Sequence, residues 1–252
     1  IWLTYQRGLD AYQHSTEEKV VEAIAYFDEV NRKDPKYAPA LAMGAITRMV
    51  LANVYRGDQL EQLTGEARRL ADTAYSQDPQ EPLVMLAKAR IESGDGNHVK
   101  AMEYARQAVE ANPNSAAARL RIAHAALVGG DPELCIQQSD KLLSLSPWDP
   151  METMAKGFKA FAYCILGEYE KSVEAMRSVN SPQRMNINLS YIEALSLHRL
   201  GRYEESQHLI ALAMTKFPNL TVSNLSKGNR NFAPSMMLPL IEGLREMGVP
   251  EE

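Results

Sequence analysis

The sequence predicts an all-α protein built from about six helix–turn–helix repeats, and three observations support this fold class. Prolines that can end a helix recur at a nearly constant interval. Small residues recur at fixed places in the predicted helices, and glycines occupy the turns between them. Repeats of this kind stack side by side, and each one buries its apolar face against its neighbours.

The prolines fall at positions 35, 79, 113, 147, 182 and 218, so neighbouring ones are 44, 34, 34, 35 and 36 residues apart. Proline ends a helix because it lacks the backbone N–H and disfavours the helical conformation in the residue before it. Because the first interval is longer than the others, we expect an insertion at residues 55–64. It is either an exposed loop or an extension of a helix.

The segment before Pro113 shows what the repeats share. Ala101, Ala105 and Ala108 lie three and four residues apart, which places them on one face of a helix. The first of these small positions recurs in the other copies, at Ala23, Ala67, Cys135, Ser172 and Ser206. The preceding helix of each repeat also has one small position, at Gly8, Gly44, Ala89, Ala123, Ala160 and Ala194. Small residues let two helices approach closely, and these positions predict where the helices of a repeat touch.

With these small positions, and with the Gly-Glu-Tyr-Glu and Gly-Arg-Tyr-Glu turns at 167–170 and 201–204, the chain resembles tetratricopeptide repeat (TPR) proteins over nearly its whole length. The resemblance implies a right-handed superhelical solenoid over residues 1–218, followed by a C-terminal cap over residues 219–252 that covers the last apolar face. It implies a fold and leaves the function open.

A finer resemblance rests on the segments 5–8 and 145–150, the extended second repeat and the ending 243–251. Together they are similar to the C-terminal repeat region of bacterial class III adenylate/guanylate cyclases and of winged-helix transcriptional regulators. The resemblance implies a sensory or partner-binding tail, in which case the intact protein could be an enzyme that this region regulates. No cyclase or DNA-binding domain is in the sequence, so no such residues carry over. A free-standing adaptor stays open.

The composition limits the classes of partner. The net charge of the 252 residues is −5, which disfavours direct contact with nucleic acid. No apolar run approaches the length of a membrane span, so we expect no membrane insertion and a cytoplasmic chain. Because the chain begins at Ile1, we expect further residues upstream, and a membrane span there would place it in the periplasm. A homodimer stays open.

The sequence shows no catalytic or metal-binding motif. His-Glu-x-x-His, Cys-x-x-Cys, phosphate-loop and Gly-x-Ser-x-Gly patterns are missing, and the five histidines have no ligand spacing. We therefore expect a non-enzymatic region without a cofactor or a metal. The two cysteines, Cys135 and Cys164, are expected to be buried free thiols, with a disulfide as the alternative.

The predicted binding surface is the concave groove, which the first helix of each repeat lines, and its ligand is expected to be a protein or a peptide. The residues whose position in the first helices turns them toward the groove are Tyr5, Arg48, Arg90, Leu120, His124, Phe161, Asn188, Tyr191, His198 and Arg199. The three arginines could each hold a carboxylate by two parallel hydrogen bonds. Alternatively, each of these groups pairs with a neighbour in the chain or is simply solvated.

Overall fold

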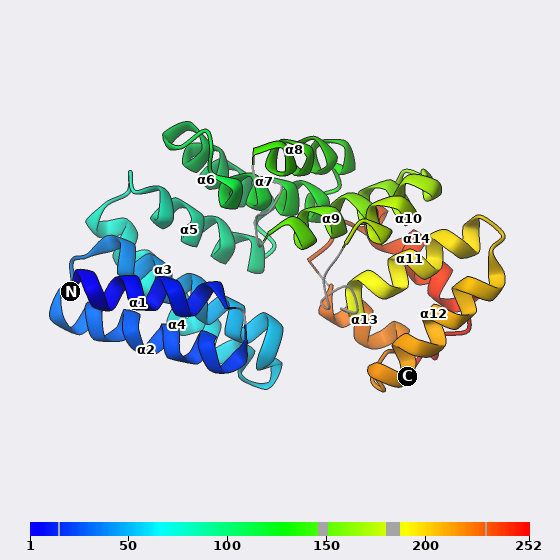
Figure 1. Ribbon diagram of the computed structural model, residues 1–252, viewed down its shortest axis with the longest axis horizontal. Helices are drawn as coiled ribbons and strands as arrows, with labels where there is room; N and C mark the ends of the chain where they lie inside the picture. The colour runs from blue at the N-terminus through cyan, green and yellow to red at the C-terminus, as the bar shows by residue number, and fades with distance from the viewer. Residues whose placement is uncertain (15, 146–150, 180–186, 230) are drawn as a thin grey trace. The chain divides into compact units, whose positions relative to one another are not determined.

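The computed structural model describes residues 1–14, 16–145, 151–179, 187–229 and 231–252. In this part of the chain every regular element is a helix (Figure 1). The helices form two compact units, residues 1–121 (unit 1) and 122–252 (unit 2), and the division falls inside helix α7. The all-α repeat fold predicted from the proline period is thereby confirmed.

Unit 1 consists of three helix pairs and the first residues of α7. Its helices are α1 (Trp2–Gln13), α2 (Glu17–Lys33), α3 (Ala38–Val50), α4 (Leu60–Gln77), α5 (Pro82–Gly94), α6 (His98–Ala111) and α7 (Ala116–Gly129). The helices α1 and α2, α3 and α4, and α5 and α6 pack as pairs, and α3 also packs on α5. The first helices α3 and α5 of successive repeats therefore lie beside one another.

Unit 2 continues the pattern and then departs from it. Its helices after α7 are α8 (Pro132–Leu145), α9 (Glu152–Ile165), α10 (Tyr169–Arg177), α11 (Ile187–Arg199), α12 (Tyr203–Lys216), α13 (Val222–Gly228) and α14 (Pro234–Glu246). The first helices α9 and α11 pack together, and α14 packs against both of them. Whether residues 219–252 form a separate cap stays a prediction.

The helices before three of the prolines end in the same way. α2, α4 and α6 stop at Asp34, Asp78 and Asn112, whose backbones leave the helical region. Each of these side chains accepts a hydrogen bond from the backbone N–H two residues later, at 3.0–3.2 Å. Such a turn replaces the helical hydrogen bonds that the following proline removes. Pro147 and Pro182 lie outside the described residues.

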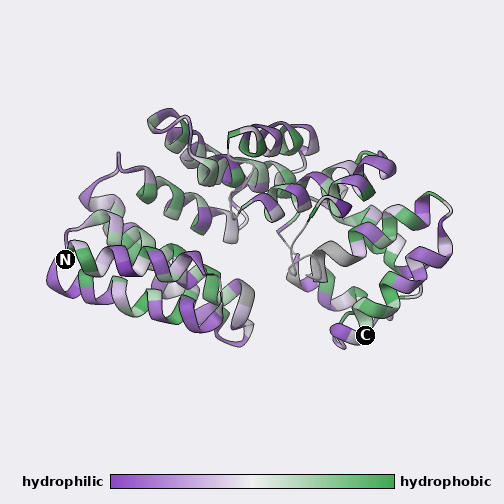
Figure 2. Cartoon of the chain, in the orientation of Figure 1, coloured by the Kyte–Doolittle hydropathy of each residue, from purple (hydrophilic) through white to green (hydrophobic). Residues whose placement is uncertain are grey.

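The small positions bring the two helices of a repeat into contact. Ala23, Ala67 and Ala101 are buried. Where the second helix carries serine instead, the hydroxyl donates to the first helix: Ser172 Oγ to the Ala160 carbonyl and Ser206 Oγ to the Ala194 carbonyl, both at 2.8 Å. A hydroxyl fits this contact because its hydrogen bond is satisfied there. Figure 2 shows the resulting mixture of hydrophobic and hydrophilic sides along the helices.

The predicted insertion at residues 55–64 is mainly helical. α3 runs into a π-helical turn, Leu51–Tyr55, and a 3-10 turn, Gly57–Gln59, leads directly into α4. The extra residues therefore lengthen the helices of the second repeat, which is the second of the two predicted forms.

Close packing of α14 gives a first testable prediction. Gly243 of α14 faces Leu195 of α11, and a Cβ at Gly243 would overlap that buried side chain. We expect Gly243→Ala to lower the free energy of unfolding by about 1–3 kcal/mol, because Leu195 or α14 must move. The matched control is Gly65→Ala in α4, where a Cβ meets nothing within 4 Å. That change should stabilise the helix by about 0.5–1 kcal/mol. Urea denaturation of both variants measures the difference, and stabilisation by both would contradict this packing of α14.

Candidate functional site

We define the first-helix face of a unit as the side formed by the first helices of its repeats. These are α1, α3, α5 and the start of α7 in unit 1, and the end of α7, α9 and α11 in unit 2. The sequence predicts ten residues for this face. The structure describes the side chains of all of them but Asn188, and it divides these into buried residues, residues with a neighbour in the same unit, and Arg90, which has no acid partner among the described residues.

Four of the ten residues are buried, which corrects their predicted exposure to a ligand. Leu120 and Tyr191 are each 2% exposed, and Tyr5 and Phe161 are also buried. Tyr5 packs edge-on against Tyr37, with ring centroids 5.3 Å apart. The physical reason is that a large apolar side chain in a first helix gains more by filling the contact with the next helix than by facing solvent.

Arg48 is also buried, and acids of its own unit hold it. Its Nη2 donates to both carboxylate oxygens of Asp28, at 3.0 and 2.8 Å, and its Nε donates to Glu66 at 3.0 Å. Hydrogen bonds from Gln62 and Arg48 lower the pKa of Glu66. Arg48 is therefore not available to a ligand, which is the alternative that the sequence left open for it.

In unit 2 the C-terminal segment covers the first-helix face. The Ala233 N–H donates to the Val128 carbonyl of α7 at 2.8 Å. Phe232 stacks on Phe161 of α9, with centroids 5.6 Å apart. Near the other end of α14, Glu246 forms an ion pair with Arg199 of α11, whose Nη1 lies 2.7 Å from the carboxylate. Three first helices thus contact one segment of the same chain.

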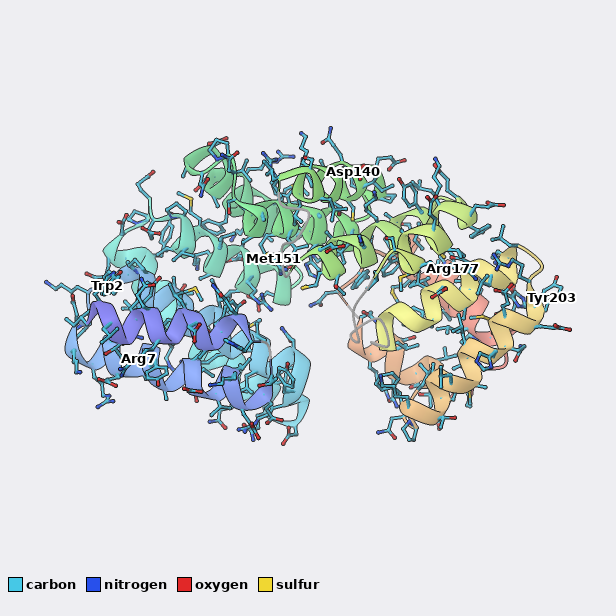
Figure 3. All side chains as sticks on the ribbon, in the orientation of Figure 1. Trp2, Arg7, Asp140, Met151, Arg177 and Tyr203 are labelled. Atoms are coloured by element: carbon cyan, nitrogen blue, oxygen red, sulfur yellow. The ribbon has the colours of Figure 1, made fainter. Side chains whose placement is uncertain are left out.

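The remaining predicted residues of unit 2 also have neighbours within it. His198 lies 3.8 Å from Glu246 and packs edge-on against the exposed Tyr203. Figure 3 labels Tyr203 among the side chains of α12. His124 packs on Phe158, with centroids 5.4 Å apart. The side chain of Asn188 lies outside the described residues. A cavity of about 190 Å³ is lined by α9, α10, α11 and α14, including Arg199 and Glu242. It is smaller than the pockets that usually hold a cofactor or a drug-sized ligand.

The two cysteines lie in unit 2 and are free and buried. Burial raises the pKa of the Cys135 thiol to about 12 and that of Cys164 to about 11. Both are therefore protonated at neutral pH, which makes them poor nucleophiles. Within the described ranges, no three His, Cys, Asp or Glu side chains gather as metal ligands would.

Unit 1 presents a different arrangement, in which two arginines have no acid as an ion-pair partner among the described residues. Arg90 of α5 and Arg121 of α7 are half-buried and interact electrostatically with each other and with Tyr12 of α1. Burial lowers the pKa of Arg90, and burial together with Arg90 lowers the pKa of Arg121. The Nε of Arg90 is buried and has no hydrogen-bond partner in the part of the chain that the structure describes.

Arg90 was predicted from the sequence, whereas Arg121 was not. In α7 the prediction placed Leu120 in the groove, one residue away from Arg121. The segment Ala116–Ala118 and its continuation carry alanines on every side of the helix, so hydrophobicity does not identify the buried face. The usable signal was that Arg119 and Arg121 flank Leu120. A rotation of the helix that buries Leu120 turns a flanking arginine toward solvent, where it keeps its charge.

Comparisons with known proteins place this structure among TPR folds. No family model matches the sequence. Cellulose synthase operon protein C of Pseudomonas fluorescens (strain SBW25) is 31% identical over 195 residues, which take in 68% of this chain and 15% of that protein. The chain therefore spans only a small part of this curated relative.

Two solved structures show the fold. The APC/C hetero-tetramer Cut9–Hcn1 matches with a TM-score of 0.65 and 18% identity, over 90% of this chain and 45% of that one. YrrB, described as a TPR protein with an unusual peptide-binding site, matches with a TM-score of 0.50 and 12% identity, over 80% and 97%. The chain has a TPR-like fold. None of the helices in its described residues is long and apolar enough to cross a membrane.

Proposed function

We propose that the chain is a non-catalytic protein-interaction module that binds a peptide or protein segment on the first-helix face of unit 1. One observation carries the proposal. In unit 2 the first-helix face is covered by residues 232–246 of the same chain, which include α14, through a backbone hydrogen bond, stacked rings and an ion pair. In unit 1 the corresponding face keeps Arg90 and Arg121 without a carboxylate among the described residues.

The contacts in unit 2 also indicate what such a face can hold. α14 is a helix that follows a short polar segment, and both parts contact first helices. A peptide in unit 1 would meet the same kinds of group: backbone carbonyls near helix ends, aromatic rings and guanidinium groups. The likeness to YrrB, whose description includes a peptide-binding site, supports this kind of ligand.

The larger protein in which this module acts is a second question, and two observations bear on it. The segments 5–8, 145–150 and 243–251 favour the partner-binding region of a bacterial signalling protein or transcriptional regulator, or the regulatory tail of a class III cyclase. The likeness to Cellulose synthase operon protein C favours a repeat scaffold in cellulose synthesis. The sequence of the intact native protein distinguishes these, since a cyclase domain, a winged helix and further repeats differ plainly.

Photocrosslinking in the native cells tests the proposed face. A photoreactive amino acid at Leu9 lies one helical turn from Tyr12, on the same side of α1. The matched control carries it at Val99 of α6, a second-helix residue that is 74% exposed. We expect a discrete protein adduct at Leu9 that is missing at Val99, and the purified partner should bind the isolated chain. Equal adducts at both positions, or adducts at Val99 alone, would place the interaction elsewhere.

A further inference from the structure

Second helices of this chain pack on the first helix of the next repeat. α2 packs on α3, α4 on α5, α8 on α9 and α10 on α11. The residues that take part lie five and one before the small position of the first helix and two after it, a spacing that puts them on one side of the helix. We call this side the preceding-repeat face. In α1 it consists of Leu3, Arg7 and Asp10.

Three of these four contacts carry an ion pair at the same two positions. Lys88 of α5 lies one residue before the small position, and its Nζ is 2.6 Å from a carboxylate oxygen of Asp72 in α4. Lys159 of α9 pairs with Asp140 of α8 in the same way. Both aspartates stand five residues after the small position of their second helix. The lysine side chains are only 12% and 19% exposed, because the preceding helix covers them.

The third pair has its charges reversed, since Arg177 of α10 lies 3.6 Å from Glu193 of α11. The charged contact therefore recurs by position. α1 carries Arg7 at this position, and the side chain is exposed, with no ion pair in the part of the chain that the structure describes. Figure 3 labels Arg7 on α1 and Arg177 on α10.

Apolar surface of α1 is open beside this arginine. Leu3 is 57% exposed, whereas the corresponding Val84 of α5 and Ala155 of α9 are completely buried. Trp2, which Figure 3 also labels, is 70% exposed. Large apolar side chains that lie together in water are typical of an interaction surface. The preceding-repeat face of α1 thus has an unpaired cation next to uncovered apolar groups.

We propose that this face of α1 binds the second helix of a further repeat of the native polypeptide, packed as α4 packs on α5. That helix would place a carboxylate against Arg7 and apolar side chains against Trp2 and Leu3. Asp10 is exposed where Ile46 and Ile91 are buried, so the helix should carry a polar or basic residue opposite it. Burial of the apolar groups supplies most of the affinity, and the ion pair fixes the register.

A second copy of this chain fits the face less well. Its last second helix, α12, carries Ala211 five residues after its small position, so it offers no carboxylate to Arg7. The 195 residues matched in the curated relative make up 15% of it, so a polypeptide with a chain of this kind has room for further repeats. The inference is independent of the proposed ligand face, which uses another side of α1.

Hydroxyl-radical labelling with mass spectrometry tests the proposal by comparing the intact native protein with residues 1–252 alone. Trp2 should be oxidised much more slowly in the intact protein, because the added helix covers it. Tyr203 of α12 is the control, since it is 59% exposed and should be oxidised at the same rate in both. Equal oxidation of Trp2 in the two proteins would overturn the proposal, and so would a native protein without a further repeat.

Variants at Arg7 test the carboxylate in the intact protein. Arg7→Glu would bring like charges together and should raise the oxidation of Trp2 toward its rate in residues 1–252, whereas Arg7→Lys should keep the protection. The control Arg32→Glu makes the same change at an exposed residue of α2 and should leave Trp2 protected. Full protection in Arg7→Glu would contradict the ion pair. Protection that rises with concentration in residues 1–252 alone would make a second copy the occupant, against the proposal.

Discussion

Replacing Ala108 by aspartate is expected to lower the free energy of unfolding by about 3–5 kcal/mol, enough to unfold or severely loosen unit 1. Ala108 is completely buried in α6 and belongs to the apolar core of that unit. A carboxylate there would lose its water without gaining a partner. The helix itself would tolerate the change, so the penalty arises from burying the carboxylate between packed helices.

The neighbouring residue provides the control for this prediction. Gln107 is exposed on the same helix, and Gln107→Asp introduces the same side chain one position away. Its effect should stay within about 0.5 kcal/mol. Thermal unfolding followed by circular dichroism compares the two variants. Similar melting curves would show that α6 does not turn its alanine face to the core.

The same substitution at two arginines of unit 1 should have effects of opposite sign. Arg48→Gln leaves Asp28 and Glu66 without their cation, and we expect a loss of about 1–2 kcal/mol, since both acids remain partly solvated. Arg121→Gln removes one of two like charges that have no acid, so we expect the melting temperature to rise. A residue that lowers stability where it stands is typical of a binding site.

Urea denaturation of the two variants and the wild type measures both effects under the same conditions. Loss of stability in both variants would show that Arg121 has a structural partner and is not held available for a ligand. The comparison does not depend on knowing the ligand, so it can be carried out with the purified chain alone.

The sequence predicted those parts of the fold that local chemistry determines. The pairs Asp34-Pro35, Asp78-Pro79 and Asn112-Pro113 end helices, and the small positions lie where the helices touch, down to the serine hydroxyls that bond to Ala160 and Ala194. Both features depend on a few residues close in sequence, so a single chain is sufficient to detect them.

The site was less predictable because it depends on contacts between distant segments. The sequence predicts a C-terminal cap over residues 219–252, but nothing in it indicates that α14 packs on the first helices α9 and α11 and pairs with Arg199. Likewise, Arg48 differs from Arg90 only in having Asp28 and Glu66 beside it, and these acids lie 20 and 18 residues away in the chain. In alanine-rich α7, several rotations of the helix bury similar surface, and the prediction chose Leu120 rather than Arg121.

Hydrogen–deuterium exchange of the chain with and without its purified partner tests the central proposal most directly. If the first-helix face of unit 1 binds the partner, α1, α5 and the start of α7 should exchange more slowly in the complex, while α14 keeps the exchange rate that it has in the free chain. Protection confined to residues 122–252, or faster exchange of α14 on binding, would contradict the account, because the partner would then occupy or displace the face that α14 covers.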